Sequence, residues 1–160
     1  MERPISEARA VWRSPLGLLA IEQADGAIAA AYFCDAGESE TPADTPLLAR
    51  VLAEFQAYFA GKRDPFDFPI AFRGTPFQVA VWRELLKIPY GETRSYGYVA
   101  RAIGKPGASR AVGMACHANP IAIAVPCHRV VGADGNLTGY GGGLDRKQAL
   151  LALERGVTQG

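Results

Sequence analysis

Short apolar runs separated by turn residues fill the first third of the chain. The runs cover residues 11–12, 18–21 and 27–33, and Ser-Pro-Leu-Gly at 14–17 and Asp25-Gly26 lie between them. An Asp-Gly step between two apolar runs is a strong signal for a β-hairpin. The pattern therefore predicts a small β-meander.

A helical pattern follows after a polar stretch. Residues 34–46 are rich in Asp, Glu, Ser, Thr and Pro, which predicts an exposed loop. Apolar residues then recur at intervals of three and four, which predicts an amphipathic helix over 46–60 that ends at Gly61. Its apolar positions are Leu47, Leu48, Val51, Leu52, Phe55, Tyr58 and Phe59.

A linker separates this part from the rest of the chain. Residues 62–72 contain prolines and alternating aromatic residues, which predict a short strand that leads into a linker near Arg73-Gly74. We therefore expect a supporting N-terminal domain over 1–73 and a C-terminal domain over 74–160.

Helices are predicted again beyond the linker. Thr75-Pro-Phe-Gln78 is a capping box with proline in the first turn, so a helix begins at Thr75. Trp82 on this helix is predicted to be core rather than a base-stacking surface. Two short helices over 95–103 and 108–117 are joined by a Gly-containing turn at 104–107, which predicts a helix-turn-helix.

The helix predicted over 108–117 is rich in small residues. They are Ala108, Ser109, Ala111, Gly113 and Ala115. Small side chains let a helix approach another surface closely. That surface is either a neighbouring helix or the groove of a nucleic acid, and these residues alone favour neither.

The apolar run over 121–131 carries the most reactive side chains. It predicts a buried strand that ends at Pro126, Cys127, His128 and Arg129. A thiol is a strong nucleophile only as thiolate, which a nearby imidazole or guanidinium stabilises. Neighbours on a regular strand point to opposite faces, so Cys127 and His128 can cooperate only if the chain turns at Pro126. The alternative is a buried, unreactive cysteine.

A last helix is predicted over 145–155. It carries Glu154 near its C-terminus, where a carboxylate is unfavourable for the helix dipole. Glu154 is therefore either a solvated surface charge or the acidic partner that a Cys-His nucleophile requires.

Composition and charge narrow the class of protein. The 160 residues are 49% hydrophobic and 21% charged, with a formal net charge of +1, so any nucleic-acid site must be a local patch. The three cysteines and two histidines show no familiar zinc spacing, and we expect no metal. Because the sequence shows no signal-peptide pattern and no stretch of about 20 apolar residues, we expect a cytoplasmic protein.

Three motifs in the second half belong together: Asn119-Pro120, Pro126-Cys-His-Arg-Val130 and Thr138-Gly-Tyr-Gly-Gly-Gly-Leu144. They resemble the signature of the O6-alkylguanine-DNA alkyltransferases, also called methylated-DNA–protein-cysteine methyltransferases. The resemblance is strong over 74–154 and weak before it, at 14–19 and 58–62. It implies an α/β (α+β) protein: a small N-terminal domain of sheet and helix, and a mostly helical C-terminal domain with a helix-turn-helix and an active-site cysteine.

The resemblance implies a chemistry centred on Cys127. The sulfur would take an alkyl group from O6 of guanine, or O4 of thymine, in DNA, and each molecule would act once, as a monomer without a cofactor. His128 would accept the thiol proton through a water molecule, and Glu154 would orient His128. Asn119 would hold the preceding turn to the active-site strand. Tyr96 would donate to the base or crowd the phosphate of the target nucleotide.

The resemblance also implies that the helix carrying Arg110 docks in the minor groove of double-stranded DNA. The damaged base would rotate out, and Arg110 would fill the space that it leaves; a solvated or phosphate-pairing charge is the alternative. The implied DNA-binding residues are Ser95, Tyr96, Ala108, Ser109, Arg110, Gly113 and Arg129. The implied pocket residues are Pro126, Val130, Tyr140, Gly141 and Gly142.

Two other classes of function fit parts of the pattern. A sensor of alkylation damage would bind the lesion without repairing it, but such proteins lack the acceptor cysteine that Cys127 supplies. A Cys-His-Glu hydrolase would need an oxyanion hole, and the sequence shows no nucleophile-elbow pattern such as G-x-C-x-G around the cysteine. Direct alkyl transfer is therefore the leading hypothesis, and damage sensing is the alternative.

Overall fold

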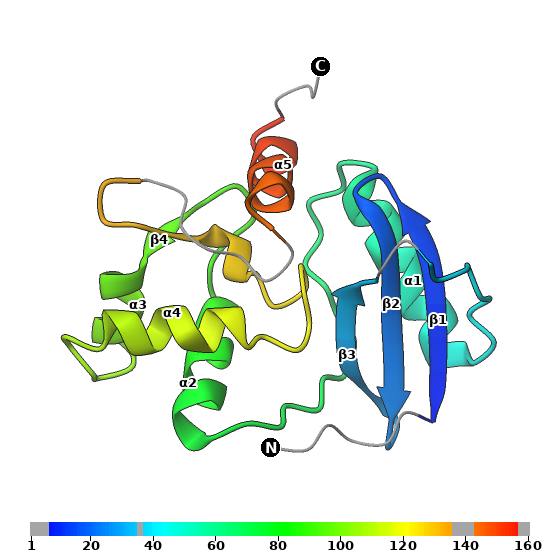
Figure 1. Cartoon of the computed structure of the whole chain (residues 1–160), viewed down its shortest axis with the longest axis horizontal. Helices are drawn as coiled ribbons and strands as arrows, with labels where there is room; N and C mark the ends of the chain where they lie inside the picture. Colours follow the sequence, from blue (N-terminus) through cyan, green and yellow to red (C-terminus); the bar gives the residue numbers. More distant parts are fainter. Residues whose placement is uncertain (1–6, 35–36, 136–142, 157–160) are drawn as a thin grey trace. The chain divides into compact units, whose positions relative to one another are not determined.

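The computed structural model describes residues 7–34, 37–135 and 143–156. Its contacts divide the chain into two compact units, Met1–Arg73 and Gly74–Gly160 (Figure 1). No helix within the described residues is long and apolar enough to cross a membrane.

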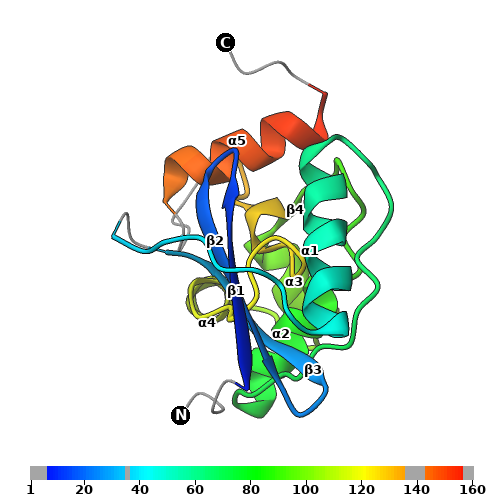
Figure 2. The ribbon, with the colours of Figure 1, turned by 90° about the vertical axis from the view of Figure 1, so that its right-hand side faces the viewer.

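The first unit is an antiparallel sheet with one helix packed on it (Figure 2). Strands β1 (Ala8–Ser14), β2 (Gly17–Ala24) and β3 (Ala27–Phe33) pair in chain order. Asp25 and Gly26 both have positive φ, 52° and 75°, as a two-residue hairpin turn requires. The predicted meander is therefore confirmed.

Helix α1 (Pro46–Phe59) packs against β1 and β2. The Thr45 side chain caps it by accepting a hydrogen bond from Leu48 N. Gly61 follows the helix with φ 92°, so the predicted helix ends where expected. The buried residues of α1 are Leu48, Val51, Phe55 and Tyr58, which form the core side of the predicted apolar stripe.

The second unit is mostly helical, and its fold class matches the prediction. Within its described residues, one strand pair is parallel and joins Arg94 to Val130 and Ser95 to Val131. In chain order its elements are α2 (Pro76–Leu85), β4 (Arg94–Ser95), α3 (Tyr96–Ala102), α4 (Ser109–His117), the 3-10 helix η1 (Cys127–Arg129), β5 (Val130–Val131) and α5 (Leu144–Glu154).

Local side-chain caps set the starts of α2 and α3. Thr75 and Gln78 exchange hydrogen bonds as a capping box, and Ser95 Oγ accepts from the backbone N–H of Tyr98 at 3.0 Å. The turn between α3 and α4 contains Gly104 with φ 75°. The predicted pair of short helices across a glycine turn is therefore confirmed.

Trp82 joins α2 to α4 inside the second unit. Its side chain is 2% exposed, and its indole Nε1 donates a hydrogen bond to Ala115 O at 2.9 Å. A Cβ added to Gly74 would lie 2.7 Å from the indole ring, so this close approach requires glycine. Trp82 is a core residue, as predicted.

The strand predicted before Cys127 is wrong. Residues 122–124 form turns, Ile123 has φ 71°, and short-range hydrogen bonds such as Val125 N to Ile121 O replace a strand ladder. The run is apolar because Ile121, Ile123 and Val125 are each at most 1% exposed, and full burial needs no extended backbone. The turn expected at Pro126 is present, because η1 begins directly after it.

Candidate active site

Cys127 lies at the start of η1 and is 6% exposed. The Asn119 side-chain amide donates to Cys127 Sγ at 3.2 Å and to Val125 O at 2.8 Å, and its oxygen accepts from Ile121 N at 3.0 Å. Asn119 N in turn bonds to Cys116 O in the last turn of α4. Asn119 therefore ties the end of α4 to the turn that holds the thiol, as expected.

The thiol of Cys127 is protonated at neutral pH in the free protein. Burial raises the pKa of Cys127 to about 11, although the hydrogen bond from Asn119 and the charge of Lys147 act in the opposite direction. A preformed thiolate, as suggested by the adjacent basic residues, is therefore not what the structure shows. Nucleophilic attack by this sulfur requires a group that removes its proton.

His128 and Glu154 form a fully buried pair. His128 Nε2 lies 2.5 Å from Glu154 Oε2, and the side chains of both residues have no exposed surface. Glu154 also accepts from Arg129 Nε at 2.8 Å, from Arg129 Nη2 at 3.1 Å and from Gly91 N at 3.1 Å. Glu154 is therefore a buried hydrogen-bond acceptor and not a surface charge.

The surroundings of Glu154 keep it ionised. Burial alone would raise the pKa of Glu154, but the hydrogen bonds and charges of His128 and Arg129 outweigh burial and hold the pKa well below its usual range. An ionised carboxylate can only accept, so His128 Nε2 carries the hydrogen in this pair. The other ring nitrogen, Nδ1, is then the acceptor.

His128 is suited to take a proton through Nδ1. That atom is buried and makes no hydrogen bond within the described part of the chain. Burial lowers the pKa of His128, Glu154 acts against this, and the charges of Arg129 and Lys147 lower the pKa further. His128 is thus a neutral, oriented imidazole, and an unsatisfied buried acceptor of this kind is often functional.

Arg129 does not lie where a DNA contact was predicted. It is 9% exposed, and besides its two bonds to Glu154 its Nη1 donates to Ile88 O at 2.6 Å. Because the guanidinium is bonded inside the unit, we withdraw Arg129 from the DNA-binding set. Its place in the site is to neutralise Glu154.

Lys147 is a buried charged residue next to the candidate site that the sequence did not lead us to predict. It is completely buried in α5, and its Nζ donates to Val130 O at 2.7 Å and to Tyr96 Oη at 3.4 Å. The available signal was helical spacing: Lys147 lies three residues before Leu150 and seven before Glu154, on one face of α5. Both of those residues are also buried.

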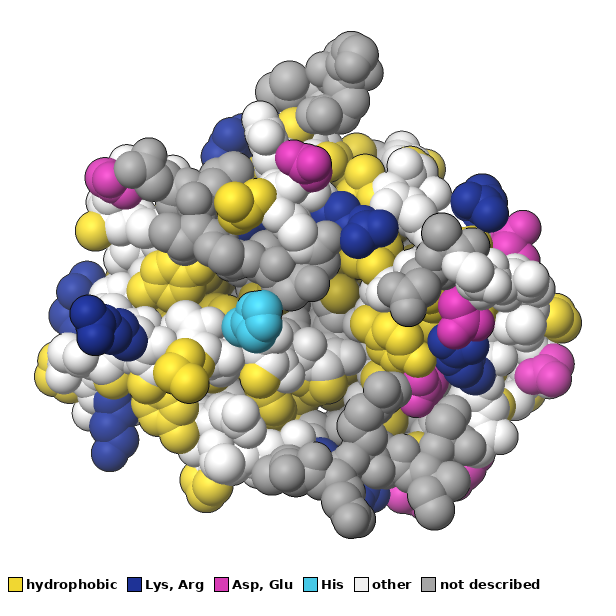
Figure 3. Space-filling view, in the orientation of Figure 1, with side chains coloured by type: hydrophobic (Ala, Val, Ile, Leu, Met, Phe, Trp, Pro, Cys, Tyr) yellow, Lys and Arg dark blue, Asp and Glu magenta, His cyan; other side chains and the backbone are white. Residues whose placement is uncertain are grey.

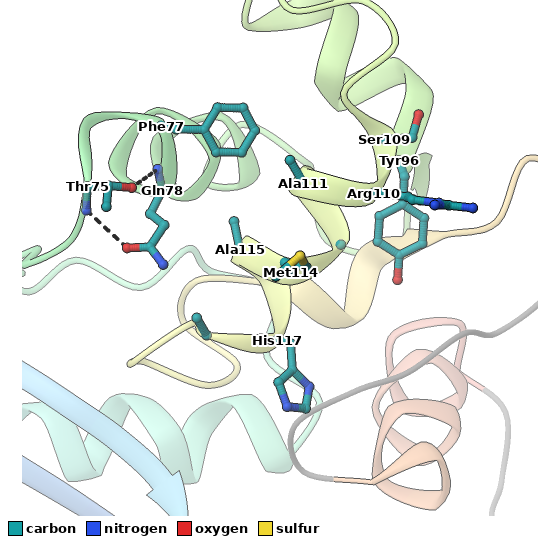
Figure 4. Close-up of a pocket in the computed structure, with 12 residues that line it drawn as sticks. Thr75, Phe77, Gln78, Tyr96, Ser109, Arg110, Ala111, Met114, Ala115 and His117 are labelled. Carbon is teal, nitrogen blue, oxygen red and sulfur yellow. Dashed lines mark hydrogen bonds between the residues drawn. The ribbon is translucent and has the colours of Figure 1, made fainter. Parts of the chain in front are cut away.

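A groove of about 1030 Å³ lies along α4 (Figure 4). Figure 4 shows Phe77 and Gln78 on one side of α4 and Arg110 with Tyr96 on the other. Of the predicted DNA-binding residues, the groove contains Tyr96, Ser109, Arg110 and Gly113. The complete lining is Thr75, Phe77, Gln78, Tyr96, Ser109, Arg110, Ala111, Gly113, Met114, Ala115, His117 and Ala118.

The small residues of α4 differ in exposure, and both roles that the sequence left open remain possible for them. Ala115 is 2% exposed and packs inward, whereas Ala111 and Arg110 are exposed on the groove. A Cβ on Gly113 would lie 3.7 Å from the Tyr96 ring, an ordinary van der Waals contact. Basic and hydrophobic side chains predominate on the visible surface over α3 and α4 (Figure 3).

The remaining predicted residues divide into three groups. Pro126 and Val130 are buried on either side of η1. Ser95 is half-buried and uses its oxygen to cap α3, and Ala108 is the N-cap of α4. Tyr140, Gly141 and Gly142 lie outside the described residues.

A metal centre finds no support in the described residues. Within them, no group of three or more His, Cys, Asp or Glu side chains is placed to hold an ion. Burial raises the pKa of Cys116, on α4, to about 12, so this thiol is a poor ligand and nucleophile as it stands.

Comparison with known proteins identifies the family. The model for the 6-O-methylguanine DNA methyltransferase DNA-binding domain matches residues 76–156, and the model for the ribonuclease-like domain of the same proteins matches 9–72. The methylated-DNA–protein-cysteine methyltransferase of Mycolicibacterium paratuberculosis is 53% identical over 149 residues, which cover 89% of this chain and 88% of that protein.

Solved structures agree with these matches. The crystal structure of Mycobacterium tuberculosis OGT in complex with DNA superposes with a TM-score of 0.84 at 48% identity, over 92% of each chain. The O6-methylguanine-DNA methyltransferase of Pyrococcus kodakaraensis superposes with a TM-score of 0.63 at 28% identity, over 92% of this chain and 99% of the other. The chain therefore belongs to the 6-O-methylguanine DNA methyltransferase family, the methylated-DNA–protein-cysteine methyltransferases.

Proposed function

We propose that this member of the family repairs O6-alkylguanine in DNA by moving the alkyl group to Cys127 Sγ, with each molecule acting once and as a monomer. The assignment of roles is supported by the burial of Cys127, His128 and Glu154. His128 is bonded to Glu154, and the Asn119 amide donates a hydrogen bond to the sulfur of Cys127. O4-alkylthymine is the second expected substrate.

The reaction is a displacement at a saturated carbon. The thiol proton passes to His128 Nδ1 through a water molecule, and the sulfur attacks the alkyl carbon. The carbon–oxygen bond breaks with its electron pair going to the base, and Tyr96 donates a hydrogen bond that offsets the charge there. Glu154 keeps His128 oriented and stabilises the imidazolium that forms. The thioether is stable, so the protein is consumed.

We propose that α4 enters the minor groove of double-stranded DNA. The exposed Ala111 and the half-buried Gly113 add little bulk to the groove-lining face of α4, so its backbone can approach a duplex closely. A base stacked in the duplex cannot reach a thiol that is 6% exposed, so the target nucleotide must rotate out. Arg110 is exposed on the same face, and we expect its side chain to fill the gap.

Intact mass decides between transfer and damage sensing. Incubation with a duplex that contains O6-methylguanine should raise the mass of the protein by about 14 Da, the mass gained when a methyl group replaces the thiol hydrogen. Peptide mapping should place the methyl group on Cys127. Binding of the lesion without any change in mass would instead identify a sensor.

Arg110→Ala separates base extrusion from simple attraction to phosphates. Extrusion costs a few kcal/mol in a paired duplex and almost nothing for free O6-benzylguanine, so the variant should slow duplex repair roughly tenfold more than the reaction with the free base. Intact-mass spectrometry of samples quenched at successive times, with each substrate, gives the two rates.

Lys105→Ala is the matched control for Arg110→Ala. Lys105 is an exposed cation in the turn before α4, and it does not line the groove. Its loss should weaken binding to every duplex and lower the salt dependence by about one counterion. Equal slowing of both substrates by Arg110→Ala would exclude the proposed role of Arg110.

A further inference from the structure

We infer that Lys147 is a positioning residue for alkyl transfer: its ammonium group orients the Tyr96 hydroxyl toward the extruded base and stabilises the Cys127 thiolate as it forms. This inference rests on the proposed function and adds a residue to it. It is carried by the burial of Lys147 and by its hydrogen bonds to Val130 O and Tyr96 Oη.

The burial of Lys147 is costly for the fold. Moving an ammonium group out of water remains unfavourable even after the protein relaxes, and Lys147 has no exposed surface. The same face of α5 buries Leu150 and Leu151, so an apolar side chain at position 147 would continue a hydrophobic stripe. A charge retained at such a place is a candidate for function.

The hydrogen bond from Lys147 to Tyr96 restricts the direction in which the phenol hydroxyl can donate. An ammonium group can only donate, so the Tyr96 oxygen accepts from Lys147 Nζ at 3.4 Å. The phenol hydrogen must then point away from Lys147. Because Tyr96 lines the groove along α4, this makes the phenol a donor to a base that enters the site. The bond is long, and we expect it to shorten when the base is bound.

The bond to Val130 fixes the ammonium group relative to the nucleophile. Lys147 Nζ donates to Val130 O at 2.7 Å, and Val130 directly follows the turn η1 that begins at Cys127. The lysine is thus anchored to the same short segment as the thiol. The ammonium group of Lys147 therefore has a defined position, unlike that of an exposed lysine.

The electrostatic effect on the sulfur has the required sign. The charge of Lys147 lowers the pKa of Cys127 against the effect of burial. Burial lowers the pKa of Lys147, and Cys127 acts to raise it, which is the reciprocal of the same interaction. Arg129 and Glu154 neutralise each other through their hydrogen bonds, so the charge of Lys147 complements the negative charge that develops on Cys127.

Lys147→Met tests this inference in the full-length protein, because it keeps a long, unbranched side chain and removes the charge. We expect the thermal midpoint to stay the same or rise, since a buried charge is lost. Transfer from an O6-methylguanine duplex at neutral pH should slow at least about tenfold. The alkylation of Cys127 by iodoacetamide, followed on the Cys127 peptide, should need a higher pH than in the wild type, and affinity for undamaged duplex should not change.

Three further variants make the test specific. Leu150→Met is the matched control, because it introduces the same side chain at a buried position one turn later on α5, and it should transfer at the wild-type rate. In a Tyr96→Phe background, Lys147→Met should slow transfer by a smaller factor than it does alone, because part of its effect acts through the phenol. If the methionine variant does not fold, Lys147→Gln keeps a donor for Val130 O without the charge and should show the same slowing.

The outcomes separate the two proposals. A wild-type protein that gains no methyl group would overturn the proposed function itself. A wild type that transfers normally, with Lys147→Met or Lys147→Gln equally fast and with an unchanged pH profile, would show that Lys147 only fills space in the core.

Discussion

Cys127→Ser should abolish alkyl transfer and leave DNA binding intact. A serine hydroxyl is a far weaker acid than a thiol, and the neutral His128 cannot generate an alkoxide from it. The fold should survive, because a hydroxyl oxygen can still accept the hydrogen bond that Asn119 Nδ2 gives to Sγ at 3.2 Å. Intact mass after incubation with the lesion should stay unchanged, while fluorescence anisotropy should report wild-type affinity for the duplex.

The other two cysteines supply the controls for this substitution. Cys116 is buried on α4 and Cys34 is half-buried in the first unit. Cys34→Ser and Cys116→Ser should each keep the gain of one methyl group. Methylation of the Cys127→Ser protein at the wild-type rate would remove Cys127 from the role of acceptor.

Glu154→Gln should impair both stability and rate. Glu154 is 1% exposed and accepts hydrogen bonds from Arg129, Gly91 and His128. Removing its charge leaves the Arg129 guanidinium buried without its counter-charge, which typically costs about 3–5 kcal/mol. Transfer should also slow, because His128 loses the acceptor that fixes its tautomer and orientation. Urea unfolding and single-turnover kinetics measure the two effects.

The stability difference between wild type and Glu154→Gln should depend on pH. The pKa of Glu154 is depressed in the folded protein, so its contribution is complete above the unfolded-state pKa of about 4.3 and is lost as pH falls toward the folded value. The unfolding free energies of the two proteins should therefore converge in acid. Identical curves across the whole range would show that the carboxylate charge is unimportant.

Adding Arg129→Met to Glu154→Gln tells the two effects apart. Replacing both members of a buried ion pair by uncharged residues often restores stability. The double variant should therefore unfold closer to the wild type and still transfer slowly, because His128 remains without its carboxylate. Recovery of the rate together with stability would mean that Glu154 acts on transfer only through the fold.

Local signals made the helices predictable from the sequence. The interactions that cap α2 and α3 join residues at most three positions apart: Thr75 with Gln78, and Ser95 with Tyr98. Both partners can therefore be recognised in a short stretch of sequence. Helix α5 was placed to within one residue at each end, because its apolar spacing repeats over three turns.

The backbone conformation and the side-chain partners at the site were harder to predict, because they depend on long-range contacts. The run before Cys127 is buried on all sides, so it has no alternation to distinguish a strand from a series of turns. Lys147 was overlooked because a charged residue on a helix is normally solvated, and only the fold reveals Tyr96 and Val130 as its partners. Proximity along the sequence likewise suggested a shared role for Cys127 and Arg129.

The turn η1 explains why these neighbouring side chains leave the chain in different directions. A 3-10 helix rotates the chain by a third of a turn per residue, so three consecutive side chains leave its axis in three directions. Cys127 contacts Asn119, whereas His128 and Arg129 reach Glu154 from different sides, and Arg129 also donates to the backbone of Ile88. Variants at these three adjacent positions should therefore be interpreted separately: the first reports on the acceptor, the second on proton transfer, and the third on the charge balance around Glu154.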